Sequence, residues 1–212
     1  MDGWLSTGAI IDVPIIFMKK TILPLGMTFM LFPTLASAHL VFAEQADGGF
    51  VSGLTHPVLG FDHLLAMFSV GVLSAQMGGR AIWSVPLAFV AVMLLGGLLG
   101  IQGVPLFSVE LGIALSVLAL GLAIAIEKKL PPVLAMLCVG LFALFHGYAH
   151  GTEMPNLAQP GFYVLGFIIG TAAIHIAGVF LGVFAEKFKR GDIFLRYLGA
   201  VIAGIGFQLI IV

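Results

Sequence analysis

The sequence predicts an all-α integral membrane protein with six transmembrane helices in the mature chain after a cleaved signal peptide. The 212 residues are 60% hydrophobic and only 9% charged, whereas about a quarter of the residues in soluble domains are charged. Apolar stretches of about 20 residues recur along the chain, the length that a helix needs to cross a hydrocarbon core of about 30 Å. Closed β-barrels show short alternating segments instead, so the helical class fits best.

The first 38 residues have the pattern of an N-terminal extension followed by a signal peptide. A pair of lysines precedes an apolar run, which ends in the small residues Ala36-Ser37-Ala38. Because these are the marks of a secretory signal and its cleavage site, we expect residues 1–38 to be removed and the mature chain to begin at His39. An uncleaved seventh helix over 10–35 is the alternative, and the two lysines and two interrupting prolines disfavour it.

Six apolar segments follow the signal, and glycine, proline and charged residues separate them. The expected spans are approximately 57–77, 81–101, 105–126, 131–150, 160–185 and 192–212. The connections between them are short, which predicts one transmembrane domain over 39–212 in which successive helices run antiparallel.

Small residues inside these segments indicate close helix packing. Gly96 and Gly100 form a G-x-x-x-G pattern, which lets helix backbones approach one another where lipid gives no hydrophobic drive for association. Such contacts can form within the chain or in a homo-oligomer. The single cysteine, Cys138, lies in an apolar run and is expected to be a buried packing residue.

Basic residues predict how the chain lies in the membrane. Every lysine and arginine after residue 38 falls in or beside the first, third and fifth connections between spans: Arg80, Lys128, Lys129, Lys187, Lys189, Arg190 and Arg196. Because basic residues stay on the cytoplasmic side, we expect a multi-pass protein of the cell inner (plasma) membrane, surrounded by lipid, with its mature N-terminus outside. The net charge of −1 gives no basic field that would indicate nucleic acid binding.

A first group of polar residues lies at the start of the first span. His56 precedes that span, and Asp62 and His63 are in its outer third. His56 and His63 are seven residues apart, two helical turns, so they share one face if a single helix includes both. Pro57 suits the first turn of such a helix. An acid at the bilayer centre costs about 2.5–3.5 kcal/mol, which makes Asp62 a candidate for function.

A second group closes the outer end of the fourth span. His146 and His150 are four residues apart and therefore stack on one helical face, a spacing that can direct two imidazoles at one metal ion. Glu153 follows in the outer loop. Three further candidates lie on the outer half or open toward it: Glu110, His175 and His39.

These ligand types indicate a class of ion. Imidazoles with a few carboxylates favour nickel, cobalt, zinc and copper(II), whereas magnesium and calcium prefer sites made of oxygen alone. No prosthetic group is expected, and no nucleotide-binding motif is present. A route inward is only partly indicated. We expect His175 to be the next ligand along this route. The few polar residues further in are Ser69, Ser74, Gln76 and Ser116.

Two other functions remain open from the residues alone. One is an intramembrane metalloenzyme with zinc on His146 and His150, although the H-E-x-x-H arrangement is absent because position 147 is glycine. The other is a metal sensor or a haem-binding helical bundle, in which His63 and His146 would serve as opposed ligands.

Two sequence blocks resemble a known family. His56 to Met67 reads H-P-V-L-G-F-D-H-L-L-A-M, similar to the H-P-x-x-G-x-D-H-L-L-A-M signature of the HupE/UreJ proteins. Phe145 to Glu153 reads F-H-G-Y-A-H-G-T-E, similar to their F-H-G-x-A-H-G-x-E block. The resemblance implies a nickel or cobalt uptake permease, not an enzyme, that supplies a metalloenzyme or cobalamin pathway. It also implies that each block carries three metal-binding residues: His56, Asp62 and His63 in the first, and His146, His150 and Glu153 in the second.

Overall fold

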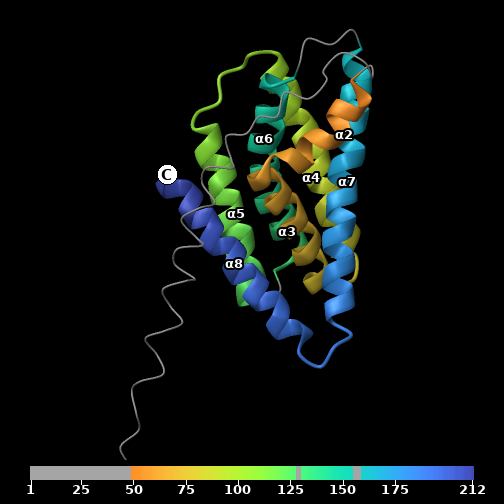
Figure 1. Cartoon of the computed structure of the whole chain (residues 1–212), viewed down its shortest axis with the longest axis vertical. Helices are drawn as coiled ribbons and strands as arrows, with labels where there is room; N and C mark the ends of the chain where they lie inside the picture. The colour runs from red at the N-terminus through yellow and green to blue at the C-terminus, as the bar shows by residue number, and fades with distance from the viewer. Residues whose placement is uncertain (1–48, 128–129, 155–158) are drawn as a thin grey trace, which may run out of the picture. The chain divides into compact units, whose positions relative to one another are not determined.

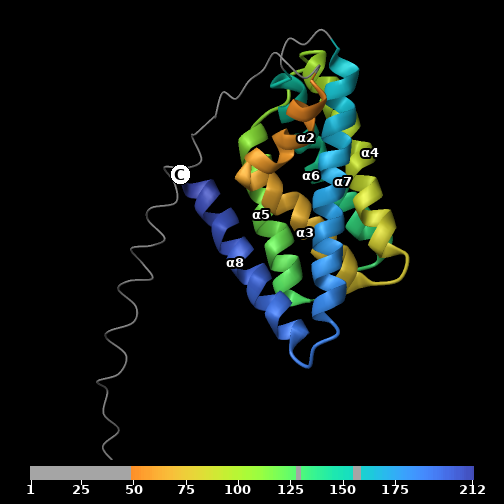
Figure 2. The same ribbon diagram turned by 45° about the vertical axis from the view of Figure 1, so that its right-hand side comes forward.

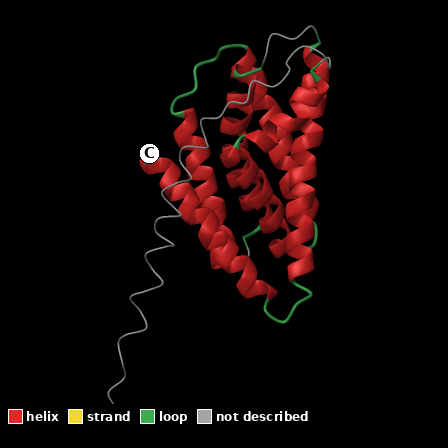
Figure 3. Ribbon diagram, in the orientation of Figure 1, coloured by secondary structure: helices red, strands yellow, loops and turns green. Residues whose placement is uncertain are grey.

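The computed structural model describes residues 49–127, 130–154 and 159–212. Within those residues the chain forms α-helices and no β-strand (Figures 1 and 3). In chain order the helices are α2 Phe50–Leu59, α3 Phe61–Met77, α4 Ala81–Ile101, α5 Val109–Ile126, α6 Pro132–Thr152, α7 Pro160–Ala185 and α8 Gly191–Ile211. The predicted signal peptide and His39 lie outside the described residues.

The helices confirm the all-α membrane class. Five of them, α4 to α8, are long and apolar enough to cross a membrane, and the bent pair α2 and α3 makes a sixth if it counts as one crossing. The spans expected at 81–101 and 160–185 coincide with α4 and α7. The first span differs from expectation, because the single helix predicted over 57–77 is instead two helices bent by 84°.

The two halves of this bent pair lie one after the other along α7 (Figure 1). Gly53 of α2 packs on the backbone of Tyr163 near the start of α7, and Gly71 of α3 packs on the carbonyl of His175 further along. Gly178, further still, packs on the carbonyl of Phe68. Both halves therefore advance in the same direction along α7, and the chain between them bends toward the middle of the bundle.

The most extensive helix contacts join helices that are not consecutive in sequence. α4 packs on α6, α5 packs on α8 (Figure 2), and α3 packs on α7. Gly96 of α4 meets the carbonyl of Leu144, and Gly100 meets that of Tyr148, so a side chain at either glycine would overlap α6. The expected close packing at this G-x-x-x-G pattern is confirmed, as a contact within the chain.

The surface of the bundle is largely apolar. Leu137, Phe180 and Trp83 are each more than 60% exposed, as expected where a helix faces lipid. Cys138 lies on the exposed face of α6, so the expectation that it is buried was wrong. An apolar run identifies a membrane helix, but in a membrane it does not say which face is inside.

The described basic residues lie at one end of the helix bundle. Arg80 joins α3 to α4, and Lys187, Lys189 and Arg190 lie between α7 and α8, at the same end of the bundle. Arg196, in the second turn of α8, donates a hydrogen bond to the carbonyl of Ala125 at the end of α5, 3.1 Å away. Among the described residues, every lysine and arginine therefore belongs to this end.

Candidate metal site

The helix that carries the first group of candidate residues is broken at Gly60, whose backbone is extended (φ −78°, ψ 106°). Pro57 lies inside α2, where its missing N–H leaves the carbonyl of Gly53 without a helical bond. Glycine then has the weakest helix preference after proline. His56 and His63 would share one helical face only if one helix included both, and that condition is not met, because they lie in separate helices. Pro57 lies inside α2, not in a first turn.

The break nevertheless brings both residues to the same two histidines of α6. The ring centroid of His56 lies 4.8 Å from that of His150. The ring of His63 lies 4.4 Å from His150 and 4.7 Å from His146. Because His63 touches both histidines of α6, the prediction that His146 and His150 share one face is confirmed. The four rings form one cluster, which we call the four-histidine cluster.

The outer part of this cluster includes an acid. Nε2 of His56 lies 3.4 Å from a carboxylate oxygen of Glu153, and His56, His150 and Glu153 each offer one ligand atom within 4.8 Å of the others. Two ligands of one ion with bonds of about 2.1 Å stand about 3.4 Å apart in tetrahedral geometry. A small inward adjustment of these three side chains would therefore suffice to hold an ion.

The inner part of the cluster is held by two hydrogen bonds. Oδ1 of Asp62 lies 2.8 Å from Nδ1 of His63, and Oγ of Ser116 on α5 lies 2.8 Å from Nε2 of His146. His146 and Ser116 are fully buried. Ser116 was expected among the polar groups further in, but the structure places it beside His146.

The termini created by the break suit a cation and its ligands. His56 lies in the last turn of α2, and Asp62 lies in the first turn of α3. The backbone carbonyls at a helix C-terminus favour positive charge, and the N–H groups at an N-terminus favour a carboxylate. Broken membrane helices use their free ends at ion sites in the same way.

His175 of α7 stands apart from the cluster. Its side chain is buried, and its ring packs edge-on against Phe89 of α4 with centroids 5.1 Å apart. Phe89 also contacts His146, at 5.7 Å. One phenylalanine ring therefore lies against both the inner part of the cluster and His175.

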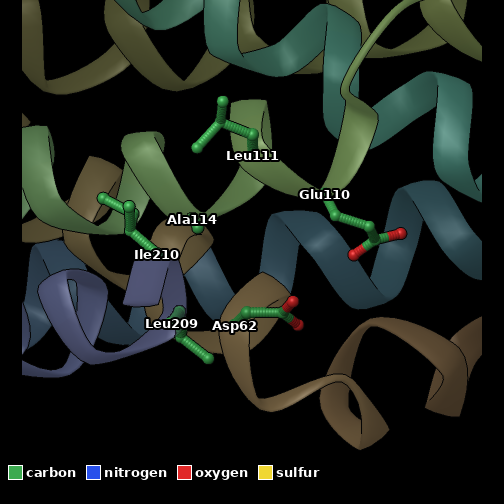
Figure 4. Close-up of a pocket in the computed structure, with 6 residues that line it drawn as sticks. All are labelled: Asp62, Glu110, Leu111, Ala114, Leu209 and Ile210. Carbon is green, nitrogen blue, oxygen red and sulfur yellow. The ribbon is translucent and has the colours of Figure 1, made fainter. Parts of the chain in front are cut away.

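Glu110 lies in the first turn of α5 and joins Asp62 in a separate pocket (Figure 4). This pocket of about 240 Å³ is also lined by apolar residues of α5 and α8: Leu111, Ala114, Leu209 and Ile210. Glu110 is exposed, while Asp62 is half-buried. Glu110 is thus placed near the acid of the first block, not among the four histidines.

Aromatic side chains surround the cluster, and sequence analysis did not identify them. The ring of Phe167 lies 4.3 Å from His150, and that of Tyr163 lies 5.9 Å from His56. Both belong to α7. No signal in the sequence distinguishes Phe167, because phenylalanines occur throughout these apolar helices, on lipid-facing and inward-facing positions alike.

Comparison with known proteins adds to this geometry. The family model for the HupE / UreJ protein matches residues 27–209. Protein HupE of Rhizobium leguminosarum bv. viciae is 41% identical over 195 residues, which cover 92% of this chain and 100% of that protein. The chain belongs to the HupE/UreJ family. No solved structure matches it.

The structure explains the residue pattern of the second HupE/UreJ block. Phe145 packs on Gly112 of α5, and Gly147 and Gly151 bring α6 against the backbone of α4. His146 and His150 lie between these packing residues and face α3. The glycines and the phenylalanine of the block thus fix the position of α6, and the two histidines use that position.

Proposed function

We propose that this HupE/UreJ protein is a permease that takes up Ni²⁺ or Co²⁺ from the outer side of the inner (plasma) membrane. The observation that carries the proposal is a set of buried ring nitrogens without a hydrogen-bond partner. They are Nε2 of His63, Nδ1 of His146 and both ring nitrogens of His150 and His175. Buried polar atoms are normally paired, so this many buried nitrogens without a hydrogen-bond partner favour a cation-binding site.

The chemistry of that region favours a borderline divalent cation. Neutral imidazole nitrogens with one or two carboxylates are donors for nickel, cobalt, zinc and copper(II). A hard cation such as magnesium would require oxygen ligands and keep much of its water. Within this set we favour nickel or cobalt, because the two sequence blocks resemble those of the HupE/UreJ family.

The contacts suggest an order of binding along the membrane normal. His56, His150 and Glu153 would receive the ion first, because His56 and Glu153 are the more exposed members of the cluster. His150 also touches His63, so it can remain bound while the ion passes to the inner pair, His63 and His146. His175, beyond Phe89, would be the next ligand.

The bent pair supports a path across the whole membrane. The parts of α7 that contact α2 and α3 run from Tyr163 to Gly182, a rise of about 29 Å at 1.5 Å per residue. That length matches the hydrocarbon core of about 30 Å. We infer that α2 and α3 form one broken span, the sixth crossing, and that the basic end of the bundle faces the cytoplasm.

The geometry favours an ion over haem or hydrolytic chemistry. The rings of His63 and His146 are in T-shaped contact with centroids 4.7 Å apart, which leaves no room for a porphyrin plane between them. Position 147, where a zinc hydrolase with H-E-x-x-H would place its base, is a glycine pressed against α4. A permease without enzymatic activity fits both observations.

The test is metal accumulation by cells that express the protein at matched membrane levels. Ni²⁺, Co²⁺, Zn²⁺ and Cu²⁺ are supplied in parallel at low concentration to wild type, His63→Ala and His146→Ala. We expect wild type to accumulate Ni²⁺ or Co²⁺ and both variants to fall to the level of cells without the protein.

The matched control is Cys138→Ala, because Cys138 lies on the same helix as His146 but on its exposed face. It should accumulate as much metal as wild type. Accumulation of no metal by wild type, or equal accumulation by wild type and both histidine variants, would refute the permease.

A further inference from the structure

We propose that Ser116 and Asp62 are positioning residues that fix which ring nitrogen His146 and His63 present to the ion. Ser116 makes His146 bind through Nδ1, and Asp62 makes His63 bind through Nε2. This assignment rests on the proposed function only in naming the ion, because the tautomers follow from hydrogen bonds that involve no metal. It changes the expected role of Asp62 from ligand to the group that orients a ligand.

The tautomer of His63 follows from the acceptor beside it. Oδ1 of Asp62 lies 2.8 Å from Nδ1 of His63 and accepts a second hydrogen bond, also of 2.8 Å, from the backbone N–H of the same residue. An ionised carboxylate only accepts, so Nδ1 of His63 carries the proton. Nε2 is then left with a lone pair, and this is the nitrogen that is buried without a partner.

The tautomer of His146 follows from the single proton of a serine hydroxyl. Oγ of Ser116 lies 2.6 Å from the carbonyl oxygen of Ile113, in the preceding turn of α5. A carbonyl has no proton to give, and two oxygens approach this closely only with a proton between them, so the hydroxyl donates to Ile113. It can then only accept from His146, whose Nε2 lies 2.8 Å away. Nε2 therefore carries the proton.

The two assignments leave one unprotonated ring nitrogen on each histidine. Nδ1 of His146, like Nε2 of His63, is buried and has no partner. Each is an acceptor, and the two rings touch. Partners that hold the distal N–H of a metal-binding histidine fix the ring orientation, and their loss typically lowers metal affinity by about 10–100-fold.

The chain contains a serine that tests this role by comparison. Ser74 of α3 is as buried as Ser116, and its hydroxyl donates to the carbonyl three residues earlier, at 2.8 Å, in the same way. The Ser74 hydroxyl makes no hydrogen bond to a histidine of the described residues. Ser74→Ala therefore removes the same helical hydrogen bond without removing a hydrogen bond to a histidine, and Ser116→Thr keeps a hydroxyl at the site.

The experiment uses purified full-length protein in detergent, with two measurements on wild type, Ser116→Ala, Ser116→Thr and Ser74→Ala. Nitrogen-15 NMR of labelled histidines, without metal, reports which ring nitrogen is protonated. Titration with Ni²⁺ or Co²⁺ gives the affinity. We expect Ser116→Ala alone to lose the Nε2-protonated signal of His146 and to bind about tenfold or more weakly, while Ser116→Thr stays close to wild type.

The two measurements separate this proposal from the permease itself. If wild type binds the metal but Ser116→Ala matches Ser74→Ala in both spectrum and affinity, the positioning role is overturned and the permease stands. If wild type binds neither metal while the His146 signal still depends on Ser116, the tautomer is established and the ion is wrong. A change of thermal stability shared by both alanine variants would belong to the lost helical hydrogen bond.

Discussion

Two helix pairs in this protein are packed through glycines, yet only one of them contributes histidines to the four-histidine cluster. In the α4–α6 pair, Gly147 rests on the carbonyl of Met93, and Gly151 rests on that of Gly97. In the α5–α8 pair, Gly121 rests on Ala203, and Gly206 rests on Leu118. α6 adds two histidines beside its glycines, whereas neither α5 nor α8 contains a histidine.

This difference in histidine content shows that small residues determine how closely two helices pack but not whether the pair carries candidate ligands. The α4–α6 pair places its histidines opposite the broken helix, where α3 supplies His63 and α2 supplies His56. α8 meets mainly α5 and stays at the edge of the bundle. The histidines thus belong to the pair that faces the break, and we expect substitutions to separate helix packing from the proposed metal binding.

The largest effect is expected for Gly147→Val. A Cβ at this position would overlap the backbone of Met93, so α4 and α6 must move apart. Overpacking costs about 1–3 kcal/mol, and more where backbone blocks relaxation. We expect little monodisperse protein by gel filtration in detergent and no metal binding. Gly204→Val, on α8 with no atom near its added Cβ, should behave as wild type, and equal loss in both would contradict this account.

Gly206→Val should destabilise the protein without impairing the site. Its Cβ would overlap the backbone at Leu118, and the α5–α8 contact would loosen. We expect a thermal midpoint lower by about 5 °C, equivalent to about 1–3 kcal/mol, with unchanged Ni²⁺ or Co²⁺ affinity in the folded fraction. A fall in affinity as large as that in stability would show that α8 supports the cluster directly.

Gly60→Ala should weaken metal binding with little loss of stability. An added Cβ would lie 3.1 Å from Nδ1 of His63, the nitrogen held by Asp62, and would push that ring by a few tenths of an ångström. We expect about tenfold weaker metal binding, the lower end for residues that orient ligands, and nearly normal yield. Gly161→Ala, which meets no atom, is the control in the same titration.

The smallest effect is expected for Arg196→Gln. It weakens an exposed hydrogen bond to the carbonyl of Ala125, a type of contact that contributes about 1 kcal/mol or less. The thermal midpoint should fall by about 4 °C at most, and metal affinity should not change. A loss larger than that of Gly206→Val would mean that the basic end of the α5–α8 pair contributes more to stability than its glycine contact does.

Helix boundaries were well predicted where glycine, proline or charged residues mark them. The start of α4 follows from Gly78-Gly79-Arg80, and the two ends of α7 follow from Pro160 and Glu186. The break at Gly60 was missed because the apolar run continues through it, and because glycines such as Gly96 and Gly112 lie inside unbroken helices. Only the combination of Pro57 with a glycine three residues later gave a local signal.

The site was predicted where one helix determines it. The spacing of His146 and His150 was sufficient, because the helical period alone places them on one face. Contacts between helices could not be predicted from the sequence. A buried serine in a helix usually bonds its own backbone, as Ser74 does, and nothing local distinguishes Ser116, whose role depends on α6 lying beside α5.

The short α2 helix also bears on how the protein is made. α2 has 10 residues, about 15 Å of helix, which is half the thickness of the hydrocarbon core. It rests on Tyr163 and Gly166 of α7, and chains are synthesised from the N-terminus. A nascent chain that ends before Pro160 would contain both histidine blocks but not the helix against which the first is set. The proposed outer metal site can therefore be completed only late in biosynthesis, after α7 has been synthesised.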